Sequence, residues 1–196
     1  MENNFQMVAK TLFGFEDLLE KELTQLGGQR VKKGVRNVTF YGDTGFMYKC
    51  NLALRTAIKI LKPIASFKVI NEKDLYDKIY NIKWENYIDH TGTIAINSTV
   101  HSTVFTHSQY ISLKAKDAIV DRIRSISGER PSVDLKFPDL KINIHIDKLF
   151  CNVSLDSSGE SLHKRGYKTA TNIAPINEVL AAGLIMLSGW DGQSDL

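Results

Sequence analysis

The spacing of apolar residues along the first third of the chain changes repeatedly between helical and strand-like periods. Phe15, Leu18, Leu19 and Leu23 fall three or four positions apart and predict a helix over 14–26. The elements predicted here, in order, are strand 5–12, helix 14–26, strands 29–35 and 37–41, helix 44–56 and strand 58–69. The order strand, helix, strand, strand, helix, strand predicts an antiparallel sheet with both helices on one face, which is the ferredoxin-like pattern.

The middle of the chain predicts a second mixed α/β region. A helix over 72–82 and a strand over 93–100 precede the longest predicted helix, 109–126, for which Ser108 is the expected N-cap. Strands over 141–147 and 149–155 follow as a hairpin, because both alternate apolar and polar residues. The apolar arc of the long helix comprises Ile111, Ala115, Ala118, Ile119, Ile123 and Ile126.

Charged residues interrupt and flank that arc. Arg122 falls inside it, so its side chain must snorkel, pair with a carboxylate or point at a partner. Lys114 and Lys116 lie beside the arc, and Asp117 and Asp121 lie between these cations. The helix surface is therefore not uniformly basic.

A turn-forming run that starts at Asp156 leads into a short basic segment. This segment contains His163, Lys164, Arg165 and Lys168, with Tyr167 among them. Lys and Arg can contact phosphates, and Tyr can stack on a base. A solvated connector explains the same residues equally well.

The last predicted helix, 175–187, is apolar almost all round, and Pro175 suits its first turn. Such a helix needs burial on more than one side. Only nine residues follow Leu187, so we expect this helix to belong to a domain whose remainder is absent. An oligomer contact is the alternative.

Composition limits the functional classes only mildly. The net charge of +3 permits a nucleic-acid partner without requiring one. Cys50 and Cys151 stand far apart, which argues against a zinc site or a disulfide scaffold and favours a reduced, cytoplasmic setting. The sequence has no secretion signal and no apolar run long enough to span a membrane. It also contains none of the common catalytic motifs, so no catalytic or metal-binding residues are predicted.

Two motifs carry a resemblance to a known family. They are the LHxRGY run at 162–167 and the AP-x-x-E-x-LAA run at 174–182, and the helical stretch from Ser108 to Asp121 agrees with them. Together they resemble the bacterial large-subunit ribosomal RNA (guanine-N2)-methyltransferases, which often carry the label of N6-adenine-specific DNA methylases. In that family the middle region is a THUMP domain.

The resemblance implies an α+β chain with three parts. These are a ferredoxin-like domain over 1–65, a THUMP RNA-binding domain over 66–157, and a linker with the first helix of a truncated Rossmann-like methyltransferase domain over 158–196. The family's Asp-Pro-x-Cys-Gly-Ser-Gly and Asn/Asp-Pro-Pro-Tyr motifs are absent, and Asp195-Leu196 resembles the start of the first catalytic strand. S-adenosylmethionine is therefore expected for the full-length enzyme and not for this fragment.

The expected partners are structured RNA, with 23S ribosomal RNA as the implied substrate, and the missing methyltransferase domain. Charge alone selects the candidate RNA contacts, which are Lys114, Lys116, Arg122, His163, Lys164, Arg165 and Lys168. Three alternatives stay open: a THUMP module of another RNA-modifying enzyme, a DNA adenine methylase, and an interaction scaffold without a nucleic-acid role.

Overall fold

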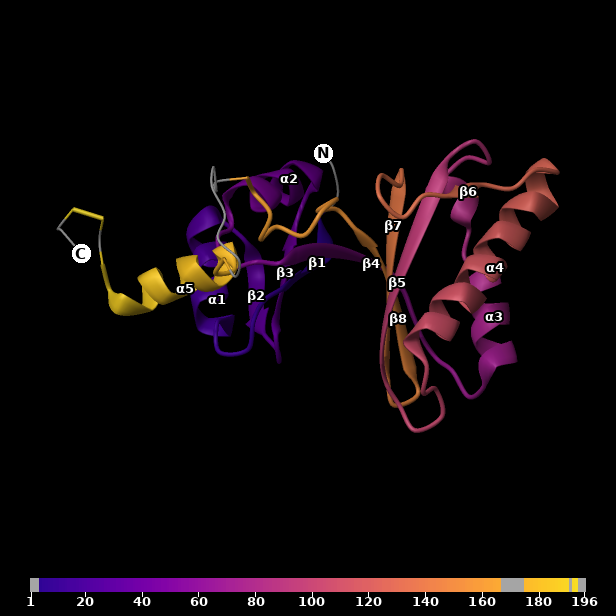
Figure 1. The fold of residues 1–196 in the computed structure, drawn as a ribbon, viewed down its shortest axis with the longest axis horizontal. Helices are drawn as coiled ribbons and strands as arrows, with labels where there is room; N and C mark the ends of the chain where they lie inside the picture. The colour runs from indigo at the N-terminus through magenta and orange to yellow at the C-terminus, as the bar shows by residue number, and fades with distance from the viewer. Residues whose placement is uncertain (1–3, 167–174, 191, 194–196) are drawn as a thin grey trace. The chain divides into compact units, whose positions relative to one another are not determined.

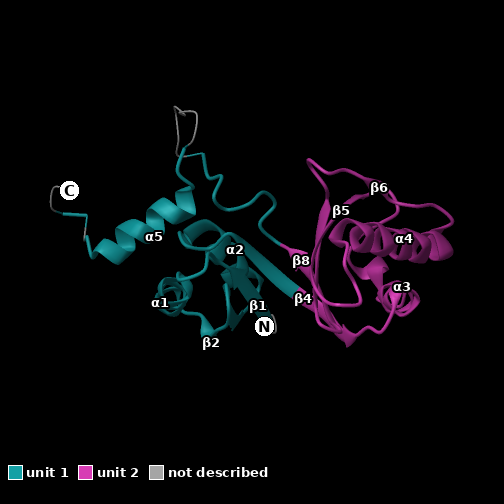
Figure 2. Ribbon diagram, turned by 60° about the horizontal axis from the view of Figure 1, so that its bottom comes forward, with its two compact units in different colours: residues 1–62, 157–196 teal, residues 63–156 magenta. Residues whose placement is uncertain are grey.

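The computed structural model of the chain describes residues 4–166, 175–190 and 192–193. It divides into two compact units (Figure 2). The first unit comprises residues 1–62 together with 157–196, and the second comprises residues 63–156. The chain thus leaves the first unit, builds the second and returns to the first.

The first unit contains the predicted order of two helices and four strands. The elements are β1 (Phe5–Lys10), α1 (Glu16–Leu26), β2 (Gln29–Lys33), β3 (Asn37–Gly42), α2 (Thr44–Ala53) and β4 (Lys59–Lys68), whose last residues enter the second unit. Strand β1 pairs antiparallel with β3 and with β4, and β2 pairs antiparallel with β3. The sheet order β2-β3-β1-β4 confirms the predicted ferredoxin-like arrangement.

Helix α2 ends earlier than its apolar pattern predicts. The predicted helix ran to residue 56, whereas α2 stops at Ala53. The buried carboxylate of Glu22 on α1 explains this end, because it accepts hydrogen bonds from the backbone N–H groups of Arg55 and Thr56. It also accepts one from the Thr56 hydroxyl, at 2.6 Å. A buried carboxylate with several donors favours a tight turn over another helical turn.

Helix α5 (Glu178–Ser188) packs one side against α1 within the first unit. Val179 contacts Phe15 and Leu18, and Gly183 lies so close to the Phe15 ring that a Cβ atom there would clash at 2.1 Å. The helix starts three residues later than predicted, because the Asn177 side chain accepts hydrogen bonds from the N–H groups of Val179 and Leu180 and caps it. Pro175 therefore precedes the helix.

The second unit forms a sheet with helices on one face (Figure 1). Its elements are α3 (Glu72–Tyr80), a 3-10 turn (Trp84–Asn86), β5 (Thr93–His101), α4 (Ser108–Ser127), β6 (Ser132–Val133), β7 (Leu140–Asp147) and β8 (Phe150–Asp156). Strand β5 pairs parallel with β6 and β7, and β7 pairs antiparallel with β8, which confirms the predicted hairpin. The sheet order in this unit is β8-β7-β5-β6.

Helix α4 confirms the predicted long helix with two corrections. His107, not Ser108, occupies the N-cap position, and no side chain caps the helix there. Ile126 is 55% exposed instead of buried, because it belongs to the last turn, beyond the sheet residues that cover Ile111 to Ile123. Gly128 ends the helix in the left-handed conformation, which glycine adopts without strain.

Candidate nucleic-acid interface

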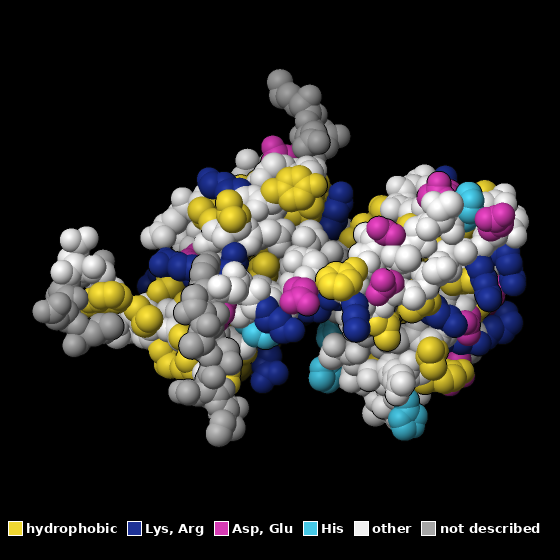
Figure 3. Space-filling model, turned by 45° about the horizontal axis from the view of Figure 1, so that its top comes forward, with side chains coloured by type: hydrophobic (Ala, Val, Ile, Leu, Met, Phe, Trp, Pro, Cys, Tyr) yellow, Lys and Arg dark blue, Asp and Glu magenta, His cyan; other side chains and the backbone are white. Residues whose placement is uncertain are grey.

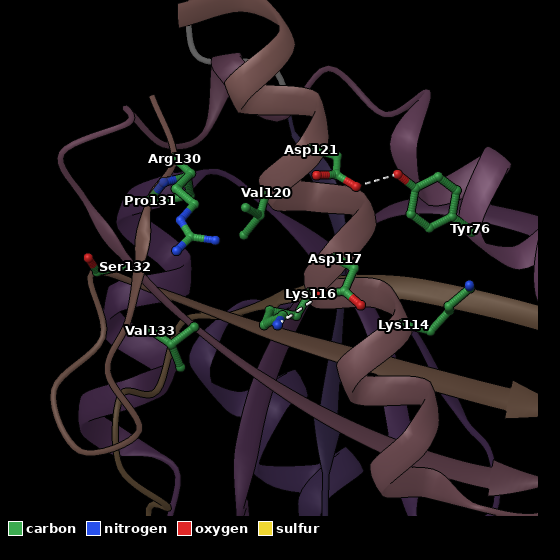
Figure 4. Close-up of a pocket in the computed structure, with 10 residues that line it drawn as sticks. All are labelled: Tyr76, Lys114, Lys116, Asp117, Val120, Asp121, Arg130, Pro131, Ser132 and Val133. Carbon is green, nitrogen blue, oxygen red and sulfur yellow. Dashed lines mark hydrogen bonds and ion pairs between the residues drawn. The ribbon is translucent and has the colours of Figure 1, made fainter. Parts of the chain in front are cut away.

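A polar hollow of about 700 Å³ lies over helix α4 in the second unit (Figure 4). Lys114, Lys116, Asp117, Val120 and Asp121 of α4 line it. The remaining lining residues are Tyr76 of α3 and the segment Arg130–Val133, which follows α4 and includes β6. The hollow therefore combines three cations, two carboxylates and one phenol.

The cations occupy two different sides of the helix. Figure 4 shows Lys116 and the Arg130 guanidinium on the side that faces Val133, whereas Lys114 lies on the side of Tyr76. Lys114 Nζ stands 5.3 Å from the Tyr76 ring centre, a cation–π contact. Lys116 Nζ lies 2.8 Å from the Asp117 carboxylate, and Arg130 forms no hydrogen bond or ion pair among the described residues. Lys116 and Arg130 thus point cationic donors into the same part of the hollow.

Tyr76 and Asp121 form the fixed wall of the hollow. The Tyr76 hydroxyl donates a hydrogen bond of 2.6 Å to Asp121, and Arg124 bonds the other oxygen of that carboxylate at 2.7 Å. This hydrogen bond raises the pKa of Tyr76 to about 12, so the phenol stays protonated at neutral pH. Asp121 is consequently occupied on both oxygens and offers little free negative charge.

Arg122 pairs with a carboxylate, one of the three possibilities that its position in the apolar arc allowed. Its guanidinium donates to both oxygens of Glu85, with distances of 2.6 Å and 3.3 Å. This hydrogen-bonded pair lowers the pKa of Glu85 and raises that of Arg122. Arg122 does not line the hollow that contains Lys114 and Lys116.

The basic segment before residue 167 belongs to the first unit and is tied to it. The Arg165 guanidinium donates to the backbone carbonyls of Leu52 and Leu54 at the end of α2, at 2.8 Å and 2.5 Å. The Arg165 N–H also donates to Glu178 at 3.0 Å, at the start of α5. His163 Nδ1 lies 2.7 Å from the Ser161 hydroxyl. Arg165 therefore links α2 to α5.

Among the described cationic residues of this segment, Lys164 alone is exposed. Its ammonium lies 3.9 Å from Glu160, a weak exposed pair. Lys168 and Tyr167 lie outside the described residues, as do Asp195 and Leu196. The predicted set of RNA contacts is thus divided between the two units, and only Lys114 and Lys116 share a hollow.

Charge on the molecular surface is mixed. On the face drawn in Figure 3, lysine and arginine side chains alternate with acidic ones instead of forming one basic patch. This agrees with the small net charge of +3. Any anionic ligand must therefore be recognised by a local arrangement of donors and not by the field of the whole protein.

Comparisons with known proteins assign both units. The family described as THUMP domain matches residues 69–156, and the family described as RlmL ferredoxin-like domain matches residues 6–61. The chain joins an RlmL ferredoxin-like domain to a THUMP domain. These matches confirm the family resemblance that the LHxRGY and AP-x-x-E-x-LAA motifs indicated. The polar hollow lies within the THUMP domain.

Relatives of the chain carry methyltransferase names. A Synechocystis sp. protein provisionally named an RNA methyltransferase is 42% identical over 183 residues, which is 93% of this chain and 48% of that protein. The ribosomal RNA large subunit methyltransferase K/L of Aeromonas hydrophila is 41% identical over 180 residues, 92% of this chain and 25% of that protein. The chain thus spans about half the length of the first relative and about a quarter of the second.

A solved structure supports the same relationship. SMU.472 is a protein provisionally named a methyltransferase, and its crystal structure was solved in complex with SAH. This structure superposes on the chain with a TM-score of 0.80 at 31% sequence identity. The match covers 97% of this chain and 50% of that protein. About half of that protein therefore matches this chain in fold.

The residues described here do not fit S-adenosylmethionine or a metal. The hollow of about 400 Å³ beside α5 is lined mainly by apolar side chains such as Val179 and Ile185. Its single carboxylate, Glu178, already accepts the Arg165 N–H. Among the described residues, no three His, Cys, Asp or Glu side chains cluster to hold a metal ion, and no helix could cross a membrane.

Sequence reasoning did not select Arg130 or Tyr76, which both line the THUMP hollow. Arg130 follows α4 by three residues and precedes Pro131, in a stretch that periodicity describes only as a loop. Tyr76 belongs to a helix 45 residues before its partner Asp121. The sequence offered one signal for Arg130, because this arginine lies between a helix-ending glycine and a proline. The Tyr76 contact offered none, because it depends on how α3 packs against α4.

Proposed function

We propose that this chain is the RNA-recognition part of an S-adenosylmethionine-dependent ribosomal RNA (guanine-N2)-methyltransferase. The observation that carries the proposal is the position of Lys116 and Arg130 in a hollow of the THUMP domain. Two cationic donors on one side of a rigid helix suit the phosphates of an RNA backbone. In this function the chain binds RNA, and a separate part of the whole protein transfers the methyl group.

The name of the Aeromonas relative supports ribosomal RNA of the large subunit as the substrate. The SAH in the complex with SMU.472 supports S-adenosylmethionine as the methyl donor, because SAH is what remains of it after methyl transfer. Guanine N2 as the acceptor rests on the resemblance of the LHxRGY and AP-x-x-E-x-LAA motifs. In the whole protein the target base must leave its stack to reach the methyl donor.

The outer side of α5 supports a further catalytic part that packs on this chain. Leu184, Ile185 and Leu187 are exposed on this helix, whereas Val179 and Gly183 are buried. Several large exposed apolar side chains on one helix indicate an interaction site. The catalytic part of the longer relatives, which exceed this chain about twofold in length, would cover it.

The proposal is tested by the binding of the 196-residue chain to a structured fragment of 23S ribosomal RNA. A DNA duplex of equal length and sequence is the competitor. We expect the RNA to bind more tightly than the DNA. We also expect its affinity to fall as the salt concentration rises, with a slope of log affinity against log salt of about −0.9 for each phosphate contact. Equal affinity for the DNA would favour the DNA methylase alternative, and no salt-dependent binding would favour an interaction scaffold.

A further inference from the structure

An apolar trough of about 380 Å³ adjoins the polar hollow of the THUMP domain. Lys116 and Val133 line both, so the two depressions meet at these residues. Ile94 and Ile96 of β5, Leu113 of α4 and Leu135 form the apolar part of the trough. A phosphate-sized cationic region and an apolar slot therefore lie next to each other.

The rim of this trough exposes large apolar side chains. Leu135 is 78% exposed, and Phe137 on the same segment is 80% exposed. The segment has a defined shape, because the Asp134 carboxylate accepts the N–H groups of Lys136 and Phe137 at 2.8 Å and 3.0 Å. Two exposed apolar side chains on an ordered turn beside an apolar slot indicate a ligand with a flat, partly apolar surface.

The trough also offers hydrogen-bonding groups that have no partner within the described residues. Strand β6 pairs with β5 only at Thr93 and Ile94, so the outer edge of β5 carries no neighbouring strand after Ile94 in the part of the chain that is described. The side-chain amides of Asn97 and Gln109 line the trough and form no hydrogen bond among the described residues. Amides and backbone edges are the groups that read nucleobases.

The cations at the junction match this arrangement. Lys116 lines both the trough and the hollow. Figure 4 shows the Arg130 guanidinium in the hollow on the same side of α4, the side that faces Val133. The nearby acids are engaged: Asp117 pairs with Lys116, Asp121 binds Tyr76 and Arg124, and Asp139 accepts from Thr93. The free donors of the junction are therefore cationic.

We propose that the trough holds an unpaired nucleotide of the bound RNA. This inference rests on the proposed function and names the part of the RNA that the THUMP domain reads. The base lies against Leu113, Val133 and Leu135, and its phosphate lies at Lys116 and Arg130. A base inside a duplex stays covered by its stacked neighbours, so only an unpaired nucleotide presents its face to such a slot.

The test compares two RNA hairpins with the same stem, one blunt and one with a single-stranded tail. Fluorescence anisotropy gives the affinity of the 196-residue chain for both. We expect the tailed hairpin to bind about tenfold more tightly, since stacking of one base on protein side chains contributes about 1–3 kcal/mol.

Variants of the chain test which residues cause the preference for the tailed hairpin. The pair Leu135→Ser and Phe137→Ser changes exposed side chains and should leave folding intact, so we expect it to remove most of the tail preference while the blunt hairpin binds as before. Leu52→Ser is the matched control, because Leu52 is 80% exposed on α2 in the first unit. Far-UV circular dichroism and thermal unfolding confirm that each variant folds.

The outcomes separate this inference from the proposed function. Equal affinity for tailed and blunt hairpins, with RNA still preferred over DNA, overturns the trough assignment alone. A tail preference that survives the Leu135→Ser and Phe137→Ser changes also overturns it. Absence of RNA binding overturns both, and a peptide that pairs with the free edge of β5 is then the occupant to test.

Discussion

Arg165 in the ferredoxin-like unit and Arg130 in the THUMP domain show two different uses of an arginine near a helix end. The Arg165 guanidinium donates to the carbonyls of Leu52 and Leu54, so it completes the hydrogen bonding of the end of α2. The Arg130 guanidinium has no such partner among the described residues and lines a hollow. Charge alone does not separate these two roles, whereas the contacts do.

The same difference extends to the surroundings of each side chain. Around Arg165 the contacts are intramolecular: Glu178 accepts the Arg165 N–H, and the carbonyls of Leu52 and Leu54 accept from the guanidinium. In the THUMP hollow, Lys116 forms only an exposed pair with its neighbour Asp117, which exchanges readily for a phosphate. Arg165 of the ferredoxin-like unit thus contributes to folding, and we expect Lys116 and Arg130 of the THUMP domain to contribute to binding.

The largest expected effect concerns the cores of the two units. Cys50 lies in the core of the ferredoxin-like unit and Cys151 in that of the THUMP domain. Burial raises the pKa of both thiols to about 12. We expect labelling by a thiol reagent at pH 8 to be about 1000-fold slower than in an unfolded peptide, since the thiolate is the reactive form.

This labelling, followed along a urea gradient by mass spectrometry, also compares the units directly. Exposure of one cysteine at lower urea than the other shows that its unit unfolds first. Rapid labelling of both cysteines without urea contradicts the buried cores.

The next effect is on the stability of the ferredoxin-like unit. Arg165→Ala leaves the buried carbonyl of Leu54 without its donor, so we expect it to lower the free energy of unfolding by about 1–3 kcal/mol. Lys164→Ala is the control and should change it by less than about 0.5 kcal/mol. Urea unfolding followed by circular dichroism measures both. Equal stability of the two variants would contradict the role of Arg165 in linking α2 to α5.

A smaller effect separates the two sides of α4. Lys116→Ala should weaken RNA binding about three- to tenfold, because it removes a phosphate donor from the junction with the trough. Lys114→Ala should weaken it less, since Lys114 lies over the Tyr76 ring on the other side of the helix. Anisotropy titrations at one salt concentration compare the variants. A larger loss for Lys114→Ala would place the RNA on the Tyr76 side.

The smallest effect is the pH dependence of the pair formed by Arg122 and Glu85. The hydrogen bond from Arg122 lowers the pKa of Glu85 below its ordinary value of 4.5. The pair therefore stabilises the fold fully above pH 4.5 and loses this contribution as the pH falls through the lowered pKa. We expect Arg122→Gln to flatten the thermal stability profile in this acidic range, as differential scanning fluorimetry measures. An unchanged profile would show that the pair contributes nothing in solution.

The sequence predicted most of the fold because the apolar periods are regular. The ferredoxin-like order and the hairpin of β7 and β8 followed from spacing alone. The errors lie at helix ends: α2 stops at Ala53 because a carboxylate from α1 binds the next turn, and α5 starts after Asn177. Such ends depend on side chains that are distant in sequence or that compete for the same cap.

The candidate site was less predictable than the fold. The list of candidate RNA contacts contains Lys114 and Lys116, which line the hollow, together with Arg122, which pairs with Glu85, and Arg165, which binds backbone carbonyls. It omitted Arg130. Pairing of a charge with a carboxylate or a carbonyl is decided by tertiary packing, so a sequence pattern does not show which cations remain for a ligand.

The most direct test of this account is the salt dependence of RNA binding by three proteins: the unchanged chain, the double variant Lys116→Ala and Arg130→Ala, and Arg165→Ala. Each lost phosphate contact should reduce the slope of log affinity against log salt by about 0.7–0.9, so two lost contacts should reduce it by about 1.4–1.8. The account predicts this reduction for the double variant and an unchanged slope for Arg165→Ala, measured where both variants are folded. A reduced slope for Arg165→Ala together with an unchanged slope for the double variant would contradict it.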